Sequence, residues 1–119
     1  MPRREAAAYN PIMADERRDI DRAVAVLSDE FGAEEVWLFG SCATGGSDEH
    51  SDIDLLVIRP ERPGSTRPAV EARLALSRNG IHRPFDLLVL TPERWREAKA
   101  RPSGVYADVL RRGVRLHER

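Results

Sequence analysis

Three short apolar runs alternate with segments of helical periodicity, and this alternation limits the fold more than any other feature of the chain. The runs are Val36–Phe39, Ile53–Ile58 and Phe85–Leu90, and a glycine or a proline follows each within two residues. Short apolar runs bounded by such residues are typical of buried strands. Strands that alternate with helices predict an α+β domain of the α/β-like kind, with one small sheet and helices packed around it.

The helical segments flank these strands and follow the last one. The first has an apolar stripe that runs from Ile20 to Phe31, and Val70 and Leu74 form one apolar face of the third. Thr91 and Pro92 predict a helix start, because threonine caps helices and proline fits the first helical position. The predicted helices cover about 14–31, 42–44, 69–77, 92–100 and 104–112, and the last segment, 114–116, is compatible with an extended conformation.

The predicted order is helix, strand, short helix, strand, helix, strand, helix, helix. The ten residues between Ser41 and Asp52 are few for a crossover between parallel strands, which usually takes a dozen residues or more. The first two strands are therefore predicted to be antiparallel, in a mixed sheet of three or slightly more strands.

Size and composition indicate one globular domain. A chain of 119 residues fits a single domain, and we expect a flexible N-terminal segment over 1–12 and one domain over 13–119. No apolar run approaches the ~20 residues of a membrane span. The single cysteine, Cys42, leaves no internal disulfide, so a cytoplasmic location is the default expectation. A net charge of −1 gives no overall attraction to nucleic acid, and direct nucleic-acid binding is not expected.

Two carboxylates lie at the start of the second strand. Asp52 and Asp54 are two residues apart, so in a strand their side chains point to the same face. Two ionised carboxylates at this distance repel each other, and a bound divalent cation removes that cost. Mg²⁺ prefers such oxygen ligands, completed by water and substrate phosphate. The alternative is structural, with Asp52 capping a turn and Asp54 on a sheet edge.

A third acid, Asp86, lies near the start of the third strand. The contexts FDLLVL and IDLLVI both place an acid before four aliphatic residues. If these two strands are neighbours, three carboxylates gather at one end of the sheet. Such a group suits two metal ions about 3.5–4 Å apart, the arrangement that aligns attacking and leaving oxygens in phosphoryl transfer. Taken alone, Asp86 would be a strand-start acid without a role.

Gly40 and Ser41 follow the first strand directly. Glycine lets a backbone approach a phosphate closely, and the serine hydroxyl and backbone N–H groups can donate to it. As an isolated pair they are an ordinary turn and helix cap. The only lysine, Lys99, follows Ala98 and not a glycine, so the sequence has no P-loop motif.

These motifs together resemble a known family. Gly40-Ser41, then ten residues, then Asp52-Ile53-Asp54 and the later Asp86, is similar to the nucleotidyltransferase superfamily that includes DNA polymerase β. The small size resembles its minimal nucleotidyltransferase (MNT) branch, whose members are commonly encoded beside a HEPN-domain protein, often as antitoxin to toxin. The resemblance covers about Ala14 to the C-terminus and includes the passages VLTPERW and LRRGVRLHE. It implies the nucleotidyltransferase fold.

The resemblance also implies a role for each residue of the motifs. Gly40 and Ser41 would bind the triphosphate of ATP or another NTP. Asp52 and Asp54 would bind two Mg²⁺ ions. Asp86 would bind the catalytic metal and help to deprotonate the acceptor hydroxyl, so the three aspartates are the implied catalytic residues. The implied reaction is in-line attack of that hydroxyl on the α-phosphorus, with transfer of a nucleoside monophosphate, most readily AMP, and release of pyrophosphate.

One motif departs from the family. Its common minimal form is GSRARG, whereas this chain has GSCATG, with Cys42 and Thr44 in place of two arginines. Arginines near a triphosphate neutralise its charge and orient it. Their replacement calls NTP affinity and activity into question and leaves the metal ligands intact.

Three functions remain open from the sequence. The first is a Mg²⁺-dependent nucleotidyltransferase whose acceptor site comes from a HEPN-domain partner or from the mate in a homodimer, because 119 residues leave little room for an acceptor-binding domain. The second is a module of the same fold that neutralises a partner by binding alone, which the missing arginines favour and the three acids oppose. The third is a metal-dependent phosphohydrolase, against which Gly40-Ser41 argues.

Overall fold

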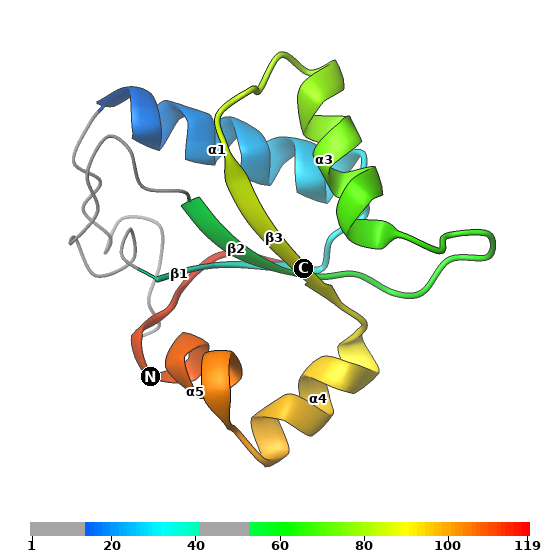
Figure 1. The fold of residues 1–119 in the computed structure, drawn as a ribbon, viewed down its shortest axis with the longest axis vertical. Helices are drawn as coiled ribbons and strands as arrows, with labels where there is room; N and C mark the ends of the chain where they lie inside the picture. Colours follow the sequence, from blue (N-terminus) through cyan, green and yellow to red (C-terminus); the bar gives the residue numbers. More distant parts are fainter. Residues whose placement is uncertain (1–13, 41–52) are drawn as a thin grey trace.

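The structure, a computed structural model, describes residues 14–40 and 53–119. The predicted N-terminal segment 1–12 and the predicted short helix over 42–44 lie outside the described residues. In the described part, helices and strands follow one another in the order α1 (Ala14–Asp29), β1 (Glu35–Phe39), β2 (Ile53–Ile58), α3 (Pro68–Arg78), β3 (Phe85–Leu90), α4 (Pro92–Ala100), α5 (Gly104–Arg112) and β4 (Val114–Glu118) (Figure 1). None of these helices is long and apolar enough to cross a membrane.

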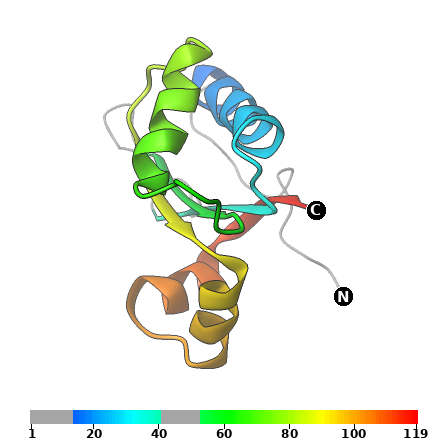
Figure 2. The ribbon, with the colours of Figure 1, turned by 90° about the vertical axis from the view of Figure 1, so that its right-hand side faces the viewer.

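One mixed sheet forms the middle of the molecule, with strand order β3-β2-β1-β4. β1 is antiparallel to both β2 and β4, whereas β2 and β3 are parallel. The helices α1 and α3 cover one face of the sheet, and α4 and α5 lie against the other (Figures 1 and 2). The predicted antiparallel first pair and mixed sheet are confirmed, and the extended C-terminal segment is a fourth strand.

The ends of the helices follow local signals. Thr91 caps α4, and its Oγ1 accepts a hydrogen bond of 3.2 Å from the backbone N–H of Arg94. α1 ends two residues earlier than predicted, because Gly32 adopts a φ of +81° and the N–H of Ala33 bonds back to the carbonyl of Leu27 at 2.9 Å. This is the usual way in which a glycine closes a helix.

Alternate residues of the strands enter two separate cores, one on each face. The core beneath α1 and α3 contains the buried residues Ile20, Ala23, Leu27, Phe31, Ala33, Val36, Leu38, Ile53, Leu55, Val57, Ala72, Leu76, Ile81, Phe85, Leu87 and Val114. The core beneath α4 and α5 is smaller and contains Phe39, Leu56, Ile58, Trp95 and Val109. Trp95 is its centre, with Trp37 and Tyr106 packed edge-on at 5.8 Å and 6.4 Å between ring centroids. The apolar stripe predicted for α1 lies in the larger core.

The apolar face expected on α3 is not the face that the helix buries. Val70 and Leu74 are 48% and 52% exposed, whereas Ala72, Ala75 and Leu76 are buried. Alanines have no bulk beyond Cβ, so they let the helix lie close to the sheet. The two large residues are left on the solvent side.

Candidate active site

Three chain segments meet at one end of the sheet, namely the end of β1 and the starts of β2 and β3. Phe39 is paired with Asp54 in the antiparallel ladder, and Asp54 is paired with Asp86 in the parallel ladder. Gly40, which follows Phe39, therefore lies at the same end of the sheet as the two aspartates. Neighbouring strands are about 4.8 Å apart, so the paired aspartates are within reach of one shared ligand.

The two aspartates lie on the same face of the sheet. Strand alternation places Asp54 on the side of Leu56 and Ile58, which belong to the core beneath α4 and α5. Residues paired in a parallel ladder share a face, so Asp86 lies on this side too. Asp54 is half-buried and Asp86 is exposed. The site thus has a half-buried carboxylate, that of Asp54, and an exposed carboxylate, that of Asp86, which an incoming molecule can contact.

Gly40 leaves space that the carboxylate of Asp54 occupies. Its φ is +75°, a conformation that side chains rarely adopt, and a Cβ at this position would collide with Oδ2 of Asp54. The sequence predicts a different task for this glycine, the close approach of a phosphate. The structure shows that glycine is needed here before any ligand binds, because the aspartate occupies the space of its missing side chain.

Replacing Gly40 by alanine is expected to lower the free energy of unfolding for two reasons, the left-handed backbone conformation of this residue and a steric clash with Asp54. A left-handed conformation costs a side-chain-bearing residue about 1–2 kcal/mol, and the overpacking against Asp54 adds about 1–3 kcal/mol. The matched control is Gly64→Ala, because Gly64 has a φ of +81° and nothing within 4 Å of its virtual Cβ. Urea unfolding of both variants measures the difference, and equal losses would contradict the contact between Gly40 and Asp54.

The predicted metal site is only partly contained in the described residues. Ser41 and Asp52 lie outside them, so their positions remain predictions. Within residues 14–40 and 53–119, no group of three acidic, histidine or cysteine side chains is arranged to hold a metal ion. The two carboxylates that the structure does place, Asp54 and Asp86, share a face and are hard oxygen donors, which is the chemistry that Mg²⁺ takes. They fit a Mg²⁺ site to which Asp52 would add a further ligand.

A cavity of about 310 Å³ adjoins Asp86. Buried apolar side chains line part of it (Leu76, Ile81 and Phe85), and basic residues line another part (Arg73, His82 and Arg83). Arg83 is fixed by an ion pair of 2.7 Å between its Nε and Oδ2 of Asp19. No sequence motif marks these basic residues, which come from α3 and from the segment before β3. They meet only because α3 packs beside β3.

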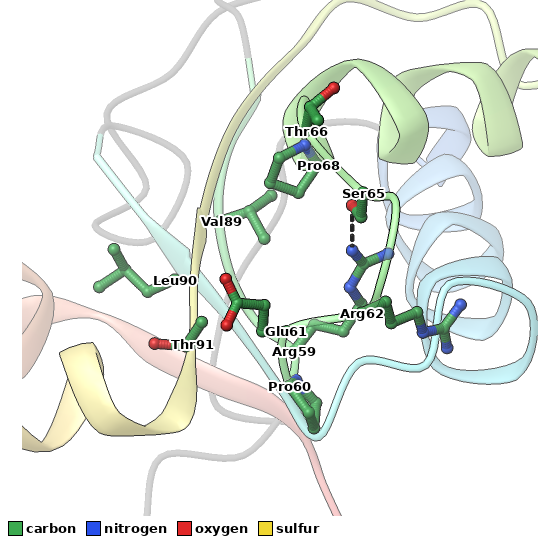
Figure 3. Close-up of a pocket in the computed structure, with 10 residues that line it drawn as sticks. All are labelled: Arg59, Pro60, Glu61, Arg62, Ser65, Thr66, Pro68, Val89, Leu90 and Thr91. Carbon is green, nitrogen blue, oxygen red and sulfur yellow. Dashed lines mark hydrogen bonds between the residues drawn. The ribbon is translucent and has the colours of Figure 1, made fainter.

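A second cavity, of about 230 Å³, lies at the opposite end of the parallel strand pair and contains none of the predicted site residues (Figure 3). One of its lining residues, Arg59, is only 3% exposed, and its Nη2 donates a hydrogen bond of 2.7 Å to Oγ of Ser65. Its guanidinium also lies 4.0 Å from the ring centre of Phe31 and 3.9 Å from Oε1 of Glu71. Burial lowers the pKa of Arg59 from its ordinary value. These contacts join the loop after β2 to α3 and to the end of α1.

The fold, and the grouping of Gly40, Asp54 and Asp86 at one end of the sheet, agree with the protein family whose sequence model the chain matches. The sequence model of the nucleotidyltransferase domain family matches residues 20–82, which is more than half of the chain. The chain therefore belongs to the nucleotidyltransferase domain family. The matched range contains Gly40, Ser41, Asp52 and Asp54, and it ends before Asp86. No curated protein matches the chain.

Solved structures with a similar fold include two toxin–antitoxin assemblies. One is a mutant of the pair MntA–HpeT, with 20% identity, a TM-score of 0.55, and coverage of 84% of this chain and 72% of that one. The other is a toxin–antitoxin with AMP-PNP, with 18% identity, a TM-score of 0.53, and coverage of 83% and 73%. A candidate nucleotidyltransferase from Sulfolobus solfataricus has 27% identity, a TM-score of 0.46, and coverage of 67% and 70%. The two toxin–antitoxin structures show that the chain shares their fold.

Proposed function

We propose that this chain is a Mg²⁺-dependent nucleotidyltransferase that transfers a nucleoside monophosphate, AMP from ATP before others, to a hydroxyl group of a partner protein. The observation that carries the proposal is the register that pairs Asp54 with Asp86 at the edge where Gly40 follows β1. Membership of the nucleotidyltransferase domain family supports nucleotidyl transfer in general. The AMP-PNP in a structure of similar fold supports an NTP as the substrate.

Each residue of the site has a proposed task. Gly40 and Ser41 bind the triphosphate, and Asp52 and Asp54 are the ligands of two Mg²⁺ ions, with Asp86 as a further ligand. Bound Mg²⁺ would neutralise the charge that develops on the phosphate oxygens. The acceptor oxygen forms a bond to the α-phosphorus while the bond from that phosphorus to the β-phosphate oxygen breaks, and pyrophosphate leaves. Asp86, which is exposed, accepts the proton of the acceptor hydroxyl.

The acceptor is proposed to come from a second protein. The described elements are used to build the sheet and its two cores, and none of them is left to form an acceptor-binding domain. The two structures of similar fold that are named as toxin–antitoxin assemblies support a partner of this kind. A HEPN-domain toxin is the proposed partner, with this chain as its antitoxin. The mate in a homodimer is the second choice.

A second function, neutralisation of a partner by binding alone, is favoured by one observation. Cys42 and Thr44 replace the arginines of the common motif, and no lysine or arginine occurs from Asp29 to Asp54. A triphosphate at this edge would therefore lack nearby positive charge from that segment. Calorimetric titration of the chain with ATP and Mg²⁺ separates the two functions. Heat of binding that disappears with EDTA supports transfer, whereas partner binding without any ATP heat supports neutralisation.

The direct test of transfer is intact-mass measurement of the partner. The chain is incubated with ATP, MgCl₂ and a HEPN-domain protein that binds it, and the expected result is a mass gain of one AMP unit or a multiple of it. EDTA is expected to prevent the gain. A partner that binds tightly but keeps its mass at millimolar ATP would contradict the transferase proposal.

A further inference from the structure

A large apolar side chain, that of Leu88, is exposed near Asp86. Leu88 follows Asp86 by two residues in β3, so its side chain lies on the same face of the sheet, about 7 Å further along the strand. Leu88 is 36% exposed, whereas its register partner in β2, Leu56, is fully buried. The smaller core therefore covers this face of the sheet at β2 and leaves it open at β3.

The position of α4 explains why Leu88 is exposed. α4 begins directly after β3, at the far end of this strand from Asp86 (Figure 1). Leu90, the last residue of β3, packs against the smaller core, but Leu88 and Asp86 on the same face are exposed. A single exposed leucine is ordinary on a protein surface. Leu88 differs from an ordinary surface leucine because it is the next residue on this face after a proposed catalytic residue.

The order of the strands indicates from which side an acceptor would reach the site. Gly40 follows β1, Asp54 is on β2 and Asp86 is on β3, which is an edge strand in the described part of the chain. In phosphoryl transfer the attacking and leaving oxygens lie roughly in line, on opposite sides of the phosphorus. If Gly40 binds the triphosphate, pyrophosphate leaves on the side of β1, and the acceptor hydroxyl attacks from the side of β3.

We propose that Leu88 is a specificity-determining residue for the acceptor, and that it contacts an apolar side chain of the partner protein next to the acceptor hydroxyl. The proposal rests on the proposed function, from which the side of the acceptor is taken. Burial of exposed apolar surface is favourable by about 25 cal/mol per Å², so Leu88 would select an acceptor hydroxyl in an apolar setting. A hydroxyl surrounded by charged side chains would be a poor acceptor.

Transfer kinetics with a HEPN-domain protein that binds the chain are the first test. Leu88→Gln keeps the length of the side chain and removes its apolar end, and it is expected to raise KM for the partner at least about fivefold with kcat nearly unchanged. Leu88→Met keeps the apolar character and is expected to retain the original KM. The control Leu74→Gln makes the same change at an exposed leucine of α3, on the other face of the sheet, and is expected to have no effect.

The outcomes of this test separate the contact at Leu88 from the transfer itself. Absence of AMP transfer by the unaltered chain would overturn both. Transfer with the same KM in Leu88→Gln would overturn the contact alone and leave the proposed function standing. The nucleobase is the other group with apolar faces that reaches this site, so the affinity for ATP with Mg²⁺ is measured by calorimetry in the same variants. A loss of ATP affinity in Leu88→Gln with an unchanged KM for the partner would also overturn the contact.

Photochemical crosslinking is the second test, and it needs no turnover. The photoreactive residue p-benzoylphenylalanine is placed at position 88 or, as the control, at position 74, and each chain is irradiated with the same HEPN-domain protein in the absence of ATP. The expected crosslink from position 88 is to the partner peptide that carries AMP after reaction with the unaltered chain, ATP and Mg²⁺. A crosslink from position 88 to another part of the partner would overturn the proposal. A crosslink from position 74 but none from position 88 would overturn it too.

Discussion

Replacing Asp54 by asparagine is expected to lower the rate of nucleotidyl transfer roughly 100- to 1,000-fold, as the loss of one group that organises transition-state charge typically does. The change keeps the shape of the side chain and removes its negative charge. The amide oxygen that remains is a weaker ligand for Mg²⁺ than the carboxylate. Asp54 is paired in register with Asp86 and its carboxylate lies against Gly40, so the change is made at the centre of the proposed site. The rate of AMP incorporation into the partner, measured by intact mass, gives the effect.

The controls for this prediction separate chemistry from folding. Asp108→Asn makes the same chemical change on α5, where Asp108 pairs with Arg112 at 3.4 Å, and it is expected to leave the rate unchanged. Asp86→Asn is expected to reduce the rate as strongly as Asp54→Asn, with the binding of the partner retained. Transfer that persists at the original rate in either site variant would remove that aspartate from the proposed machinery.

Truncation of Trp95 to alanine is expected to cause a large loss of stability. Trp95 is 1% exposed and is the centre of the smaller core, where it contacts Trp37 and Tyr106. Removal of a buried tryptophan side chain typically costs about 3–5 kcal/mol. Domains of this size are stable by only about 5–15 kcal/mol in total. Thermal unfolding followed by circular dichroism is expected to show a melting temperature lower by roughly 10–20 °C.

Trp95→Phe is the matched comparison for this variant. The Nε1 of Trp95 is buried and has no hydrogen-bond partner in the described part of the chain, so phenylalanine loses volume but no hydrogen bond. The cost is expected to be less than half that of Trp95→Ala. A small effect of the alanine variant would mean that α4 and α5 contribute little to the stability of the sheet, contrary to the packing of the smaller core.

The elements with strong local signals were predicted closely. The bounds predicted for β2, β3, α4 and α5 agree with those of the structure. Each of them is defined by residues next to it in the chain, such as Thr91 and Pro92 at the start of α4. Helix caps, turn residues and apolar runs act over a few residues, so a sequence window contains all the information that they need.

The buried face of α3 was not predictable in the same way. Val70 and Leu74 are the more hydrophobic pair, yet Ala72, Ala75 and Leu76 make the contact with the sheet. Which face of a helix is buried depends on the space that the other elements leave, and here that space accepts small residues. A hydrophobicity pattern describes the side chains of the helix alone. It contains no information about the shape of the sheet surface on which the helix packs.

The candidate site was only partly visible in the sequence. Asp54, Asp86 and Gly40 were predicted as site residues from their motifs, and the structure brings these three residues to one end of the sheet. The basic residues Arg73 and Arg83 beside Asp86 were missed, because they are scattered along the chain and belong to no motif. The contact between Gly40 and Asp54 was also missed, since it joins two strands.

The amino-acid sequence by itself determined that two strands start with an acid followed by four aliphatic residues, and that a glycine with unusual backbone freedom ends a third. These are properties of short segments, set by strand alternation and by the flanking turn residues. Only the tertiary structure decided that the two acid-bearing strands are parallel neighbours with Asp54 opposite Asp86. The physical reason is that strand order and register depend on how both faces of the sheet pack and on the crossover through α3, which are contacts between residues far apart in the chain.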